Sequence, residues 1–360
     1  MERELKKKIL FIVLHRKDRS PGQRFRHEQY ISYLEENGFS CIISALLDEK
    51  SDEIFYSKGN FIKKILILIK TISIRRNDFK KAKDVDAIFI YREAISIWSV
   101  HFEKKFKKEK KKIIFDFDDS VWLKNVSNEN KHFSWIKNAA KTSKIIALSD
   151  VVIAGNPYLA NYALEYNKNV SIFPTTIDTE EYQREKNTKS EKIIIGWSGS
   201  ITTIQHFNFA VPILKKIQQK FNNSVIFKVI GDGNFFNQEL NIKGIAWDKK
   251  TEISELSTFD IGIMPLPDSE WTKGKCGLKG LQYMALEIPT IMSPVGVNTE
   301  IINDGENGFL ASNEDEWVEK LSLLIENHDL REKLGKAGRK TVEEKYSVKA
   351  NYQKYLDLFK

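Results

Sequence analysis

The stretch GKCGLKGLQYMALEIPTIMSPVG (Gly274–Gly296) sets a glycine-rich loop with two lysines before a segment of helical period. A short apolar strand and a second glycine loop follow. The helix is predicted over Leu278–Glu287 and the strand over Ile288–Pro294. Helices that alternate with short apolar strands are typical of βαβ units, which build parallel sheets. The stretch therefore favours an α/β domain.

The same alternation extends over most of the chain. Further strands in the second half are predicted at Lys192–Gly199, Val225–Gly233 and Phe259–Leu266. Those in the first half are predicted at Lys8–Leu14, Ser40–Leu46, Asp86–Arg92, Lys112–Asp118, Val151–Asn156 and Ser171–Thr176. Helices fit between them, and the one over His27–Gly38 ends on a glycine suited to the C′ position. The pattern predicts two doubly wound, Rossmann-like α/β domains.

A polar segment without a periodic apolar face interrupts the alternation and is interpreted as a linker. At 360 residues the chain is long enough for two domains of comparable size. We expect an N-terminal domain over residues 1–177, a linker over 178–192 and a C-terminal domain over 193–342. Residues 343–360 are predicted to form a helix that returns to the N-terminal domain.

The positive charge is concentrated in the first half of the chain. Residues 1–180 carry 33 Lys+Arg and 24 Asp+Glu, or +9, and the remainder is −1, which gives the total of +8. The segment FIKKILILIKTISIRR (Phe61–Arg76) combines a broad apolar surface with cations. It fits either an interfacial helix on an anionic membrane or a buried helix. The run Glu103–Lys112 is interpreted as a solvated helix face. The basic runs lack interleaved aromatic residues, so nucleic acid is not an expected partner.

Neither a signal peptide nor a metal-binding cysteine pattern is recognisable. Met1 precedes a polar run, and the apolar stretch after it is too short for a membrane span. Cys41 and Cys276 lie far apart and have no metal-ligand spacing. We expect a cytoplasmic protein.

Two loops of the first half carry candidate ligand-binding side chains. The loop after the first strand lacks G-x-G-x-x-G, which disfavours a simple NAD enzyme. It has a turn at Gly22, and Arg24 and Arg26 then lie where a helix begins, which suits an anionic or polyhydroxyl ligand.

The fourth strand ends in FDFDDSVW, which supplies three carboxylates, on Asp116, Asp118 and Asp119. A metal site is one interpretation, but no further acid or histidine pattern completes it. We favour hydrogen bonding to a sugar hydroxyl or to Arg92, which is followed by Glu93.

Three glycine loops of the second half could hold a nucleotide. Backbone amides of Gly199 and Ser200, before a helix, suit a phosphate. Gly231 leaves room for a base or a ribose. Lys275 and Lys279 bracket Gly277 at a helix start, a combination of cations and amides that suits a diphosphate.

The run GLKGLQYMALEIPTIMSPVGVNTEIINDGENGFL (Gly277–Leu310) resembles the donor-binding segment of the family 4 retaining glycosyltransferases of GT-B fold. That segment contains E-x7-E within a stretch like E-G-F-G-L-x-x-x-E-A-M-A-x-G-x-P-V. FDIGIMPL, IGWSGS, FDFDDSVW and SPGQRFR also resemble members of this family. The similarity covers nearly the whole chain and is strongest over Ile193–Leu310.

The resemblance implies two Rossmann-like domains that face each other across a cleft, and sugar transfer without an obligatory metal or other cofactor. The glutamate that holds the ribose in the family falls on Gln282, and the one that contacts the donor sugar falls on Gly274. The family's basic pair is replaced by the uncharged SITT, so Lys275 and Lys279 are the candidates to neutralise the diphosphate.

The catalytic candidates are Asp118, Asp119, Lys275 and Lys279. The donor-binding candidates are Gly199, Ser200, Thr202, Gly231, Gly277, Leu278 and Gln282. The acceptor-binding candidates are Gly22, Arg24, Arg26, Arg92 and Glu93.

By this resemblance the chain would transfer a sugar, with retention, from a nucleotide diphosphate sugar to a glycan or lipid-linked acceptor. Surface polysaccharide synthesis at the inner face of a membrane is the expected setting. Two alternatives remain: a catalytically inactive nucleotide-sugar-binding protein, and a nucleotide-sugar epimerase. The epimerase is disfavoured because His15, His101 and His206 are scattered along the chain.

Overall fold

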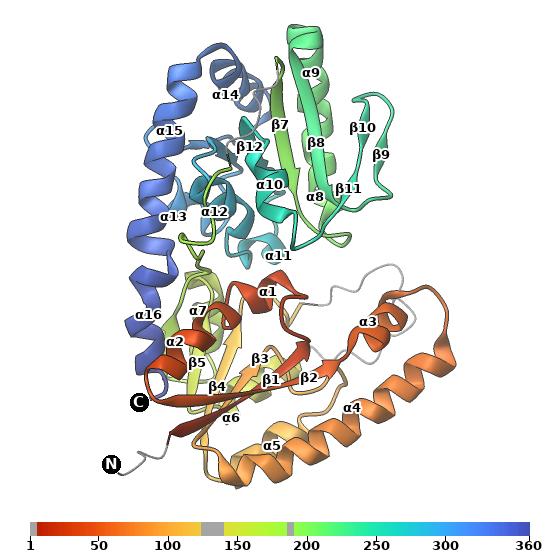
Figure 1. The fold of residues 1–360 in the computed structure, drawn as a ribbon, viewed down its shortest axis with the longest axis vertical. Coiled ribbons are helices and arrows are strands. Elements are labelled where there is room, and N and C mark those ends of the chain that lie inside the picture. Colours follow the sequence, from red (N-terminus) through yellow and green to blue (C-terminus); the bar gives the residue numbers. More distant parts are fainter. Residues whose placement is uncertain (1–5, 124–139, 186–190) are drawn as a thin grey trace. The chain divides into compact units, whose positions relative to one another are not determined.

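The computed structural model describes residues 6–123, 140–185 and 191–360. The predicted linker thus falls partly, at residues 186–190, outside the described residues. The chain forms two compact units. The N-terminal unit comprises Met1–Pro174 and Tyr352–Lys360, and the C-terminal unit comprises Thr175–Asn351. Each unit contains a six-stranded sheet whose paired strands are parallel, as the alternation of strands and helices predicts (Figure 1).

The sheet of the N-terminal unit has the order β2-β1-β3-β4-β5-β6. Its strands are β1 (Lys7–His15), β2 (Phe39–Leu47), β3 (Ala87–Tyr91), β4 (Lys112–Phe117), β5 (Val151–Ala154) and β6 (Val170–Ile172). Its helices are α1 (Pro21–Arg24), α2 (Ile31–Glu36), α3 (Glu49–Tyr56), α4 (Phe61–Lys81), α5 (His101–Lys108), α6 (Ala140–Leu148) and α7 (Pro157–Leu164). The strand order reverses at β1, where the chain crosses first to β2 and then back to β3. Ligands of doubly wound sheets bind beyond the carboxyl ends of the strands at such a reversal.

The last residues of the chain complete the core of this unit. Helix α16 (Val348–Asp357) ends among aromatic side chains, where the Tyr355 ring stacks on Tyr30 with centroids 4.2 Å apart. Phe359 packs against Phe11 and Phe89, which lie on β1 and β3. Tyr30 belongs to the predicted helix His27–Gly38, which forms as a 3₁₀ turn (Glu28–Tyr30) followed by α2. Gly38 has φ +85°, as a glycine at a helix C′ position requires.

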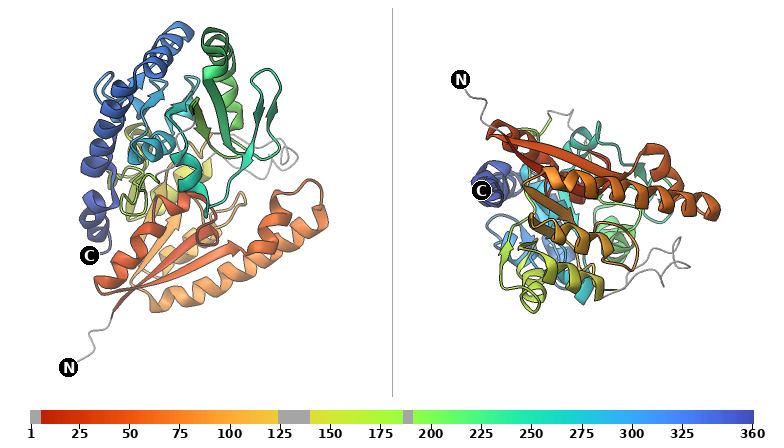
Figure 2. Two further views of the ribbon diagram at one scale, coloured as in Figure 1. Left: turned by 45° about the horizontal axis from the view of Figure 1, so that its top comes forward. Right: turned by 90° about the horizontal axis from the view of Figure 1, so that it is seen from below.

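Helix α4 is amphipathic and largely exposed, so the interpretation as a buried helix is wrong. Its buried residues are Ile67, Thr71, Arg75 and Asp78. Five apolar side chains of its first half remain exposed, namely Phe61, Ile62, Ile65, Leu66 and Ile69. Helix α5 lies beside it (Figure 1, Figure 2), and Lys105 of α5 lies over the Phe79 ring at 5.4 Å. The two basic runs of the sequence are therefore neighbours in space. Within the described ranges no helix is both long and apolar enough to cross a bilayer.

The sheet of the C-terminal unit has the order β11-β8-β7-β12-β13-β14. Its strands are β7 (Ile193–Ser198), β8 (Val225–Gly231), β11 (Ile245–Ala246), β12 (Ile261–Met264), β13 (Thr290–Met292) and β14 (Phe309–Leu310), and β9 (Phe236–Asn237) pairs with β10 (Ile242–Lys243). Its helices are α8 (Ile204–Phe207), α9 (Val211–Phe221), α10 (Glu252–Ser257), α11 (Glu270–Lys273), α12 (Leu278–Ala285), α13 (Asn298–Ile301), α14 (Glu314–Glu326) and α15 (His328–Thr341). The order reverses at β7, so the loops after β7 and β12 meet at the edge where a ligand is expected.

Candidate functional site

The loop after β7 is closed by its own hydrogen bonds. The Gly199 amide donates to the Ile230 carbonyl at 2.9 Å, and the Ser200 amide donates to Thr203 Oγ1 at 2.9 Å. The prediction that these two amides are free for a phosphate is therefore wrong. The hydroxyl oxygens of Ser200 and Thr202 lie 3.0 Å apart in an exposed contact of this loop.

The loops after β7 and β8 approach each other closely, and this explains a glycine at position 231. Gly231 has φ +140°, and a Cβ there would lie 2.5 Å from the Gly199 carbonyl oxygen. A side chain at position 231 would push the two loops apart, whereas one at position 199 would collide with the Trp197 ring. Gly231 therefore shapes this edge of the sheet, and its contact with a base or a ribose stays a prediction.

Both predicted lysines lie near the start of α12. Gly277 has φ +70° and caps this helix, and a Cβ there would lie 2.3 Å from Ile301 Cδ1. Leu278 is the first residue of the helix and Lys279 the second. Lys279 Nζ lies 5.5 Å from the centroid of the Trp197 ring, so it reaches back over the end of β7. Lys275 Nζ lies 5.1 Å from the centroid of the Trp271 ring.

His206 of α8 joins these lysines, although its place in the sequence did not single it out. The residue is 6% exposed, and its Nδ1 is buried without a hydrogen-bond partner among the described residues. Burial, with Lys279 and Lys275 adding to it, lowers the pKa of His206 to about 4. A neutral imidazole and two cations thus gather at the reversal point of this sheet. The only sequence signal for His206 is its position on the first helix after β7.

Gln282 lies one turn further along α12 and is 5% exposed. Its Nε2 donates to Tyr182 Oη at 3.1 Å and to Glu252 Oε1 at 3.3 Å. Glu252 also accepts from Tyr182 Oη at 2.6 Å and from Trp247 Nε1 at 2.7 Å. The side chain at the family's ribose-binding position is therefore part of a buried network. Gly274, at the position of the other glutamate, ends α11.

The two carboxylates that follow β4 both lie beside Arg92. Asp118 Oδ1 accepts from Tyr91 Oη at 2.7 Å and from Arg92 Nε at 2.8 Å, so the contact predicted with Arg92 is present. Asp119 lies 4.0 Å from Arg92 Nη2. Burial opposes ionisation of Asp118, but Arg92 and Arg26 outweigh it and hold its pKa below the ordinary value. Asp118 is therefore ionised and already neutralised by Arg92.

Gly22 allows the first loop to approach this cluster, because a Cβ there would lie 2.1 Å from Tyr91 Oη. Glu93 Oε2 pairs with Lys141 Nζ at 2.8 Å. The Arg24 guanidinium lies over the Phe25 ring at 4.9 Å. Contact of Gly22, Arg24, Arg92 and Glu93 with an acceptor stays a prediction.

Arg26 does not fit its predicted acceptor-binding role. Arg26 and Asp116 are each 1% exposed and form an ion pair inside the N-terminal unit. The Arg26 Nε lies 3.2 Å from Asp116 Oδ2, and its Nη1 donates to the Phe173 carbonyl oxygen. The sequence shows an arginine after a turn, but its partner is 90 residues away in the chain. Arg26 therefore has a structural role.

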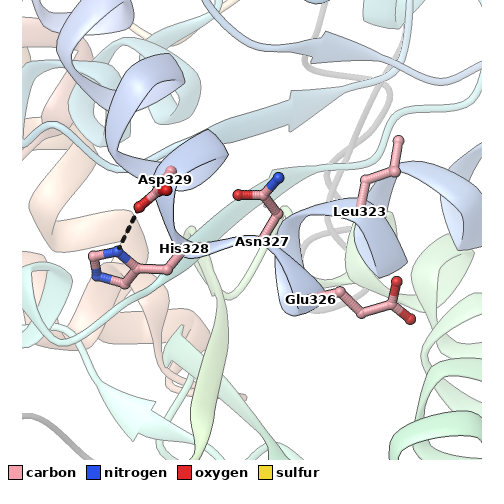
Figure 3. Close-up of a pocket in the computed structure, with 5 residues that line it drawn as sticks. All are labelled: Leu323, Glu326, Asn327, His328 and Asp329. Atoms are coloured by element: carbon pink, nitrogen blue, oxygen red, sulfur yellow. Dashed lines mark ion pairs between the residues drawn. The ribbon is translucent and has the colours of Figure 1, made fainter.

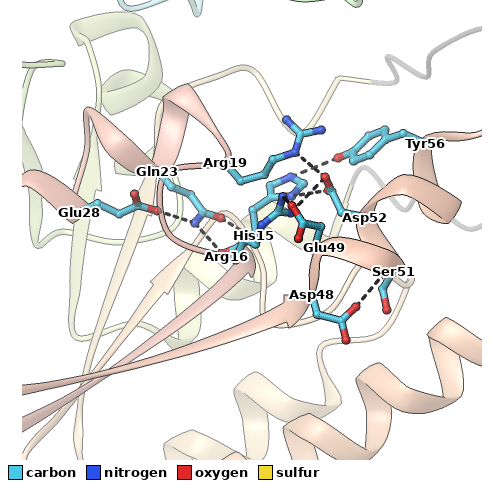
Figure 4. Close-up of polar contacts among 10 residues, drawn as sticks. All are labelled: His15, Arg16, Arg19, Gln23, Glu28, Asp48, Glu49, Ser51, Asp52 and Tyr56. Carbon is cyan, nitrogen blue, oxygen red and sulfur yellow. Dashed lines mark hydrogen bonds and ion pairs between the residues drawn. The ribbon is translucent and has the colours of Figure 1, made fainter. Parts of the chain in front are cut away.

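A second polar network lies at the carboxyl end of β1 (Figure 4). Asp52 of α3 is 4% exposed and accepts from Arg19 and from His15 Nδ1, the latter at 3.2 Å. His15 Nε2 lies 3.2 Å from Tyr56 Oη. Gln23 accepts from the His15 amide and donates to its carbonyl, both at 2.9 Å. These bonds fix the loop that carries Gly22.

Two further features lie apart from these loops. A surface hollow of about 470 Å³ is lined by Leu323, Glu326, Asn327, His328 and Asp329, at the turn between α14 and α15 (Figure 3). None of the predicted site residues lines it. The described residues include no group of three or more His, Cys, Asp or Glu placed to hold a metal ion.

Each unit contains a doubly wound parallel sheet with polar loops at the point where the strand order reverses. Two such units are characteristic of the GT-B class, and comparison with known proteins supports this assignment. Residues 178–341 match the model of the family "Glycosyl transferases group 1". This stretch lies within the C-terminal unit and agrees with the predicted class of enzyme, a glycosyltransferase. The narrower assignment to family 4 stays a prediction.

Individual relatives are distant. An uncharacterized glycosyltransferase of Methanocaldococcus jannaschii is 27% identical over 247 residues, which is 61% of this chain and 67% of that one. The capsular polysaccharide biosynthesis glycosyltransferase CapM of Staphylococcus aureus is 27% identical over 235 residues, with 62% of this chain and 57% of the relative covered. The matched stretch thus spans only a little over half of CapM. The structure of HepE from Anabaena with UDP and glucose superimposes with a TM-score of 0.69 at 11% identity, and 98% of each chain is covered. This likeness confirms the GT-B fold.

Proposed function

We propose that the chain is a retaining glycosyltransferase that moves a sugar from a nucleotide diphosphate sugar to a glycan or lipid-linked acceptor during surface polysaccharide synthesis. The observation that carries this proposal is the gathering of Lys275, Lys279 and His206 at the reversal point of the C-terminal sheet. The UDP and glucose bound by HepE and the capsular role in the name of CapM support the donor class and the setting.

The chemistry follows from where charge develops. The bond between the anomeric carbon and the diphosphate breaks, and negative charge grows on the departing phosphate oxygens. Lys275 and Lys279 would stabilise this charge electrostatically, without a metal, and a neutral His206 would donate a hydrogen bond. The acceptor oxygen would bond to the anomeric carbon on the face that the diphosphate leaves, and its proton would pass to a phosphate oxygen. Asp118 is therefore not required as a nucleophile, and we assign it and Asp119 to the orientation of Arg92.

Lys279→Ala should weaken binding of the nucleoside diphosphate about 10- to 100-fold, because a charge-assisted hydrogen bond contributes about 1.5–3 kcal/mol. UDP, GDP and ADP are first screened by thermal shift, since a ligand of the native state raises apparent stability. Calorimetric titration with the best of them then measures affinity. Lys336→Ala, at a lysine whose side chain is 68% exposed, is the matched control. Equal affinities of the two variants would remove Lys279 from the donor site.

Turnover separates the proposal from its main alternative, an inactive nucleotide-sugar-binding protein. That alternative is favoured by Gly274 and by the Gln282 network, since neither position carries the family's glutamate. The assay follows release of the nucleoside diphosphate from its sugar with glycan and polyprenyl-linked acceptors. Release that depends on an acceptor supports a transferase, whereas binding without release supports the inactive protein.

We also propose that the enzyme works on the anionic cytoplasmic surface of a membrane, held there by α4. The exposed side chains Ile62, Leu66 and Ile69 are spaced by three or four residues, which aligns them along one face of the helix. Ile62 is 77% exposed, and burial of such a side chain in an interface is favourable by about 1.5 kcal/mol or more. The lysines of α4 and the adjacent α5 supply attraction to anionic lipid.

The triple substitution Ile62→Ser, Leu66→Ser and Ile69→Ser should lower partitioning onto anionic liposomes more than about tenfold, because it removes the apolar part of this face. Co-sedimentation at low salt measures the effect. Leu323→Ser, at an exposed leucine of α14, is the control for surface polarity in general. If the unaltered chain does not bind even at low salt, where attraction is strongest, the membrane proposal is overturned.

A further inference from the structure

The Glu252 carboxylate is buried among donors from three separate segments of the C-terminal unit. The residue is 5% exposed and begins α10. Tyr182 precedes β7, Trp247 follows β11, and Gln282 belongs to α12; each donates one hydrogen bond to this carboxylate. These three donors are neutral. A buried carboxylate is costly unless the geometry of its hydrogen bonds is well kept, so the site is expected to be rigid.

The network fixes which end of the Gln282 amide faces Glu252. A carboxylate can only accept, so the amide nitrogen must point toward it and the amide oxygen must point away. A carboxylate at position 282 would instead stand about as far from Glu252 as the present 3.3 Å. Two buried carboxylates at that distance do not both ionise. A second carboxylate at position 282 would therefore be unfavourable, and the amide of Gln282 avoids this repulsion.

Gln282 also lies on the same side of α12 as the lysine assigned to the diphosphate. Lys279 and Gln282 are three residues apart, and residues at that spacing are neighbours on a helix surface. A polar group one turn from a bound diphosphate is in reach of the next group of the ligand, which is a hydroxyl-bearing sugar ring. An amide oxygen there would accept a hydrogen bond from such a hydroxyl.

We propose that Glu252 is a positioning residue of the donor site: it holds the Gln282 amide so that the amide oxygen accepts from a ring hydroxyl of the nucleotide sugar. This inference rests on the proposed function for its ligand. The expected repulsion between two carboxylates at positions 252 and 282 does not depend on the ligand, because it follows from the distance between the two side chains.

The test exchanges the two side chains. Gln282→Glu alone should lower the melting temperature and weaken binding of the nucleoside diphosphate about tenfold, because two carboxylates then meet. The double variant Gln282→Glu with Glu252→Gln restores one charge and should recover both quantities. Glu252→Gln alone keeps the size of the side chain and should weaken binding about tenfold. It should raise KM for the donor while kcat and KM for the acceptor stay unchanged, a split that a merely structural role would not give.

The outcomes separate this inference from the proposed function. If Lys279→Ala weakens binding but Glu252→Gln weakens binding of neither the nucleoside diphosphate nor the nucleotide sugar, the donor site stands and the positioning role is overturned. If no nucleoside diphosphate binds the unaltered chain, the proposed function fails and the ligand part of this inference fails with it. In that case the melting temperatures of the single and double variants still decide whether two carboxylates at these positions repel each other. An effect seen with the nucleoside diphosphate itself assigns the hydroxyl to the ribose; an effect confined to the nucleotide sugar assigns it to the transferred sugar.

Discussion

Replacement of Arg26 by alanine is expected to destabilise the N-terminal unit by about 3–5 kcal/mol, because it leaves a buried carboxylate without its partner. Asp116 is 1% exposed on β4, and the Arg26 guanidinium supplies its counter-charge. The same guanidinium also donates to the Phe173 carbonyl, which follows β6. Its loss therefore removes an ion pair and a link between two parts of the sheet. Native-state hydrogen exchange of the β4 and β6 amides measures the change within this unit.

Two further variants show whether the effect belongs to the buried charge. Arg76→Ala, at an exposed arginine of α4, should change stability by no more than about 0.5 kcal/mol. The double variant Arg26→Met with Asp116→Leu removes both charges and should recover most of the loss, since apolar replacement of a buried ion pair is often neutral. Equal stabilities of Arg26→Ala and Arg76→Ala would show that the pair contributes nothing.

The sheets could be predicted because their central strands carry a local signal. Lys8–Leu14 contains the continuous apolar run Ile9–Leu14 and lies within β1, where Ile9–Val13 are buried. The edge strands β9, β10, β11 and β14 have two residues each, too few to show any alternation. Their pairing depends on partners distant in the sequence, so no local pattern marks them. The division into two units could be predicted because the alternation of strands and helices is interrupted. The packing of the last residues on the N-terminal unit depends instead on aromatic contacts such as Tyr355 on Tyr30.

The site could be predicted where its residues are close together in the sequence, and not where tertiary contacts bring them together. Lys275 and Lys279 flank Gly277 in the sequence, so this loop can be recognised from its residues. The structure explains the glycine by its φ of +70°. The sequence does not show that the amides of Gly199 and Ser200 are already hydrogen-bonded. In the structure the first donates to a carbonyl of the neighbouring strand and the second to a nearby threonine hydroxyl. Glu252 lies 30 residues from Gln282 in an unremarkable helix, so only the fold reveals the pair.

His27→Phe is expected to stabilise the N-terminal unit at neutral pH by about 1–3 kcal/mol, because it removes buried polar atoms that have no partner. The His27 ring is fully buried, and neither of its nitrogens has a hydrogen-bond partner in the described part of the chain. Its centroid lies 5.7 Å from that of Phe11, with the rings stacked, and 5.4 Å from those of Phe89 and Tyr91. A phenyl ring fits these aromatic surroundings with little change of volume.

The advantage of His27→Phe should grow as the pH falls. Burial, with Arg26 adding to it, lowers the pKa of His27 to about 3. The unfolded chain takes up a proton near pH 6.5 and the folded one does not, so this contribution to stability is complete above pH 6.5 and is lost on acidification toward pH 3. Each pH unit inside that window costs the unaltered protein about 1.4 kcal/mol that the variant keeps.

Hydrogen exchange of the β1 and β3 amides from pH 7 to pH 4 isolates this effect from that of His206, which belongs to the C-terminal unit. His101→Phe, at an exposed histidine of α5, should give no pH-dependent difference from the unaltered chain. Groups such as Glu28, whose pKa burial raises, act in the opposite sense but are shared by both proteins, so they cancel in the comparison. A difference between His27→Phe and the unaltered chain that stays constant across this range would show that His27 gains a proton in the folded state. The acid sensitivity of this unit would then have to come from its paired carboxylates, of which Asp118, with a lowered pKa, also loses stabilisation as the pH falls.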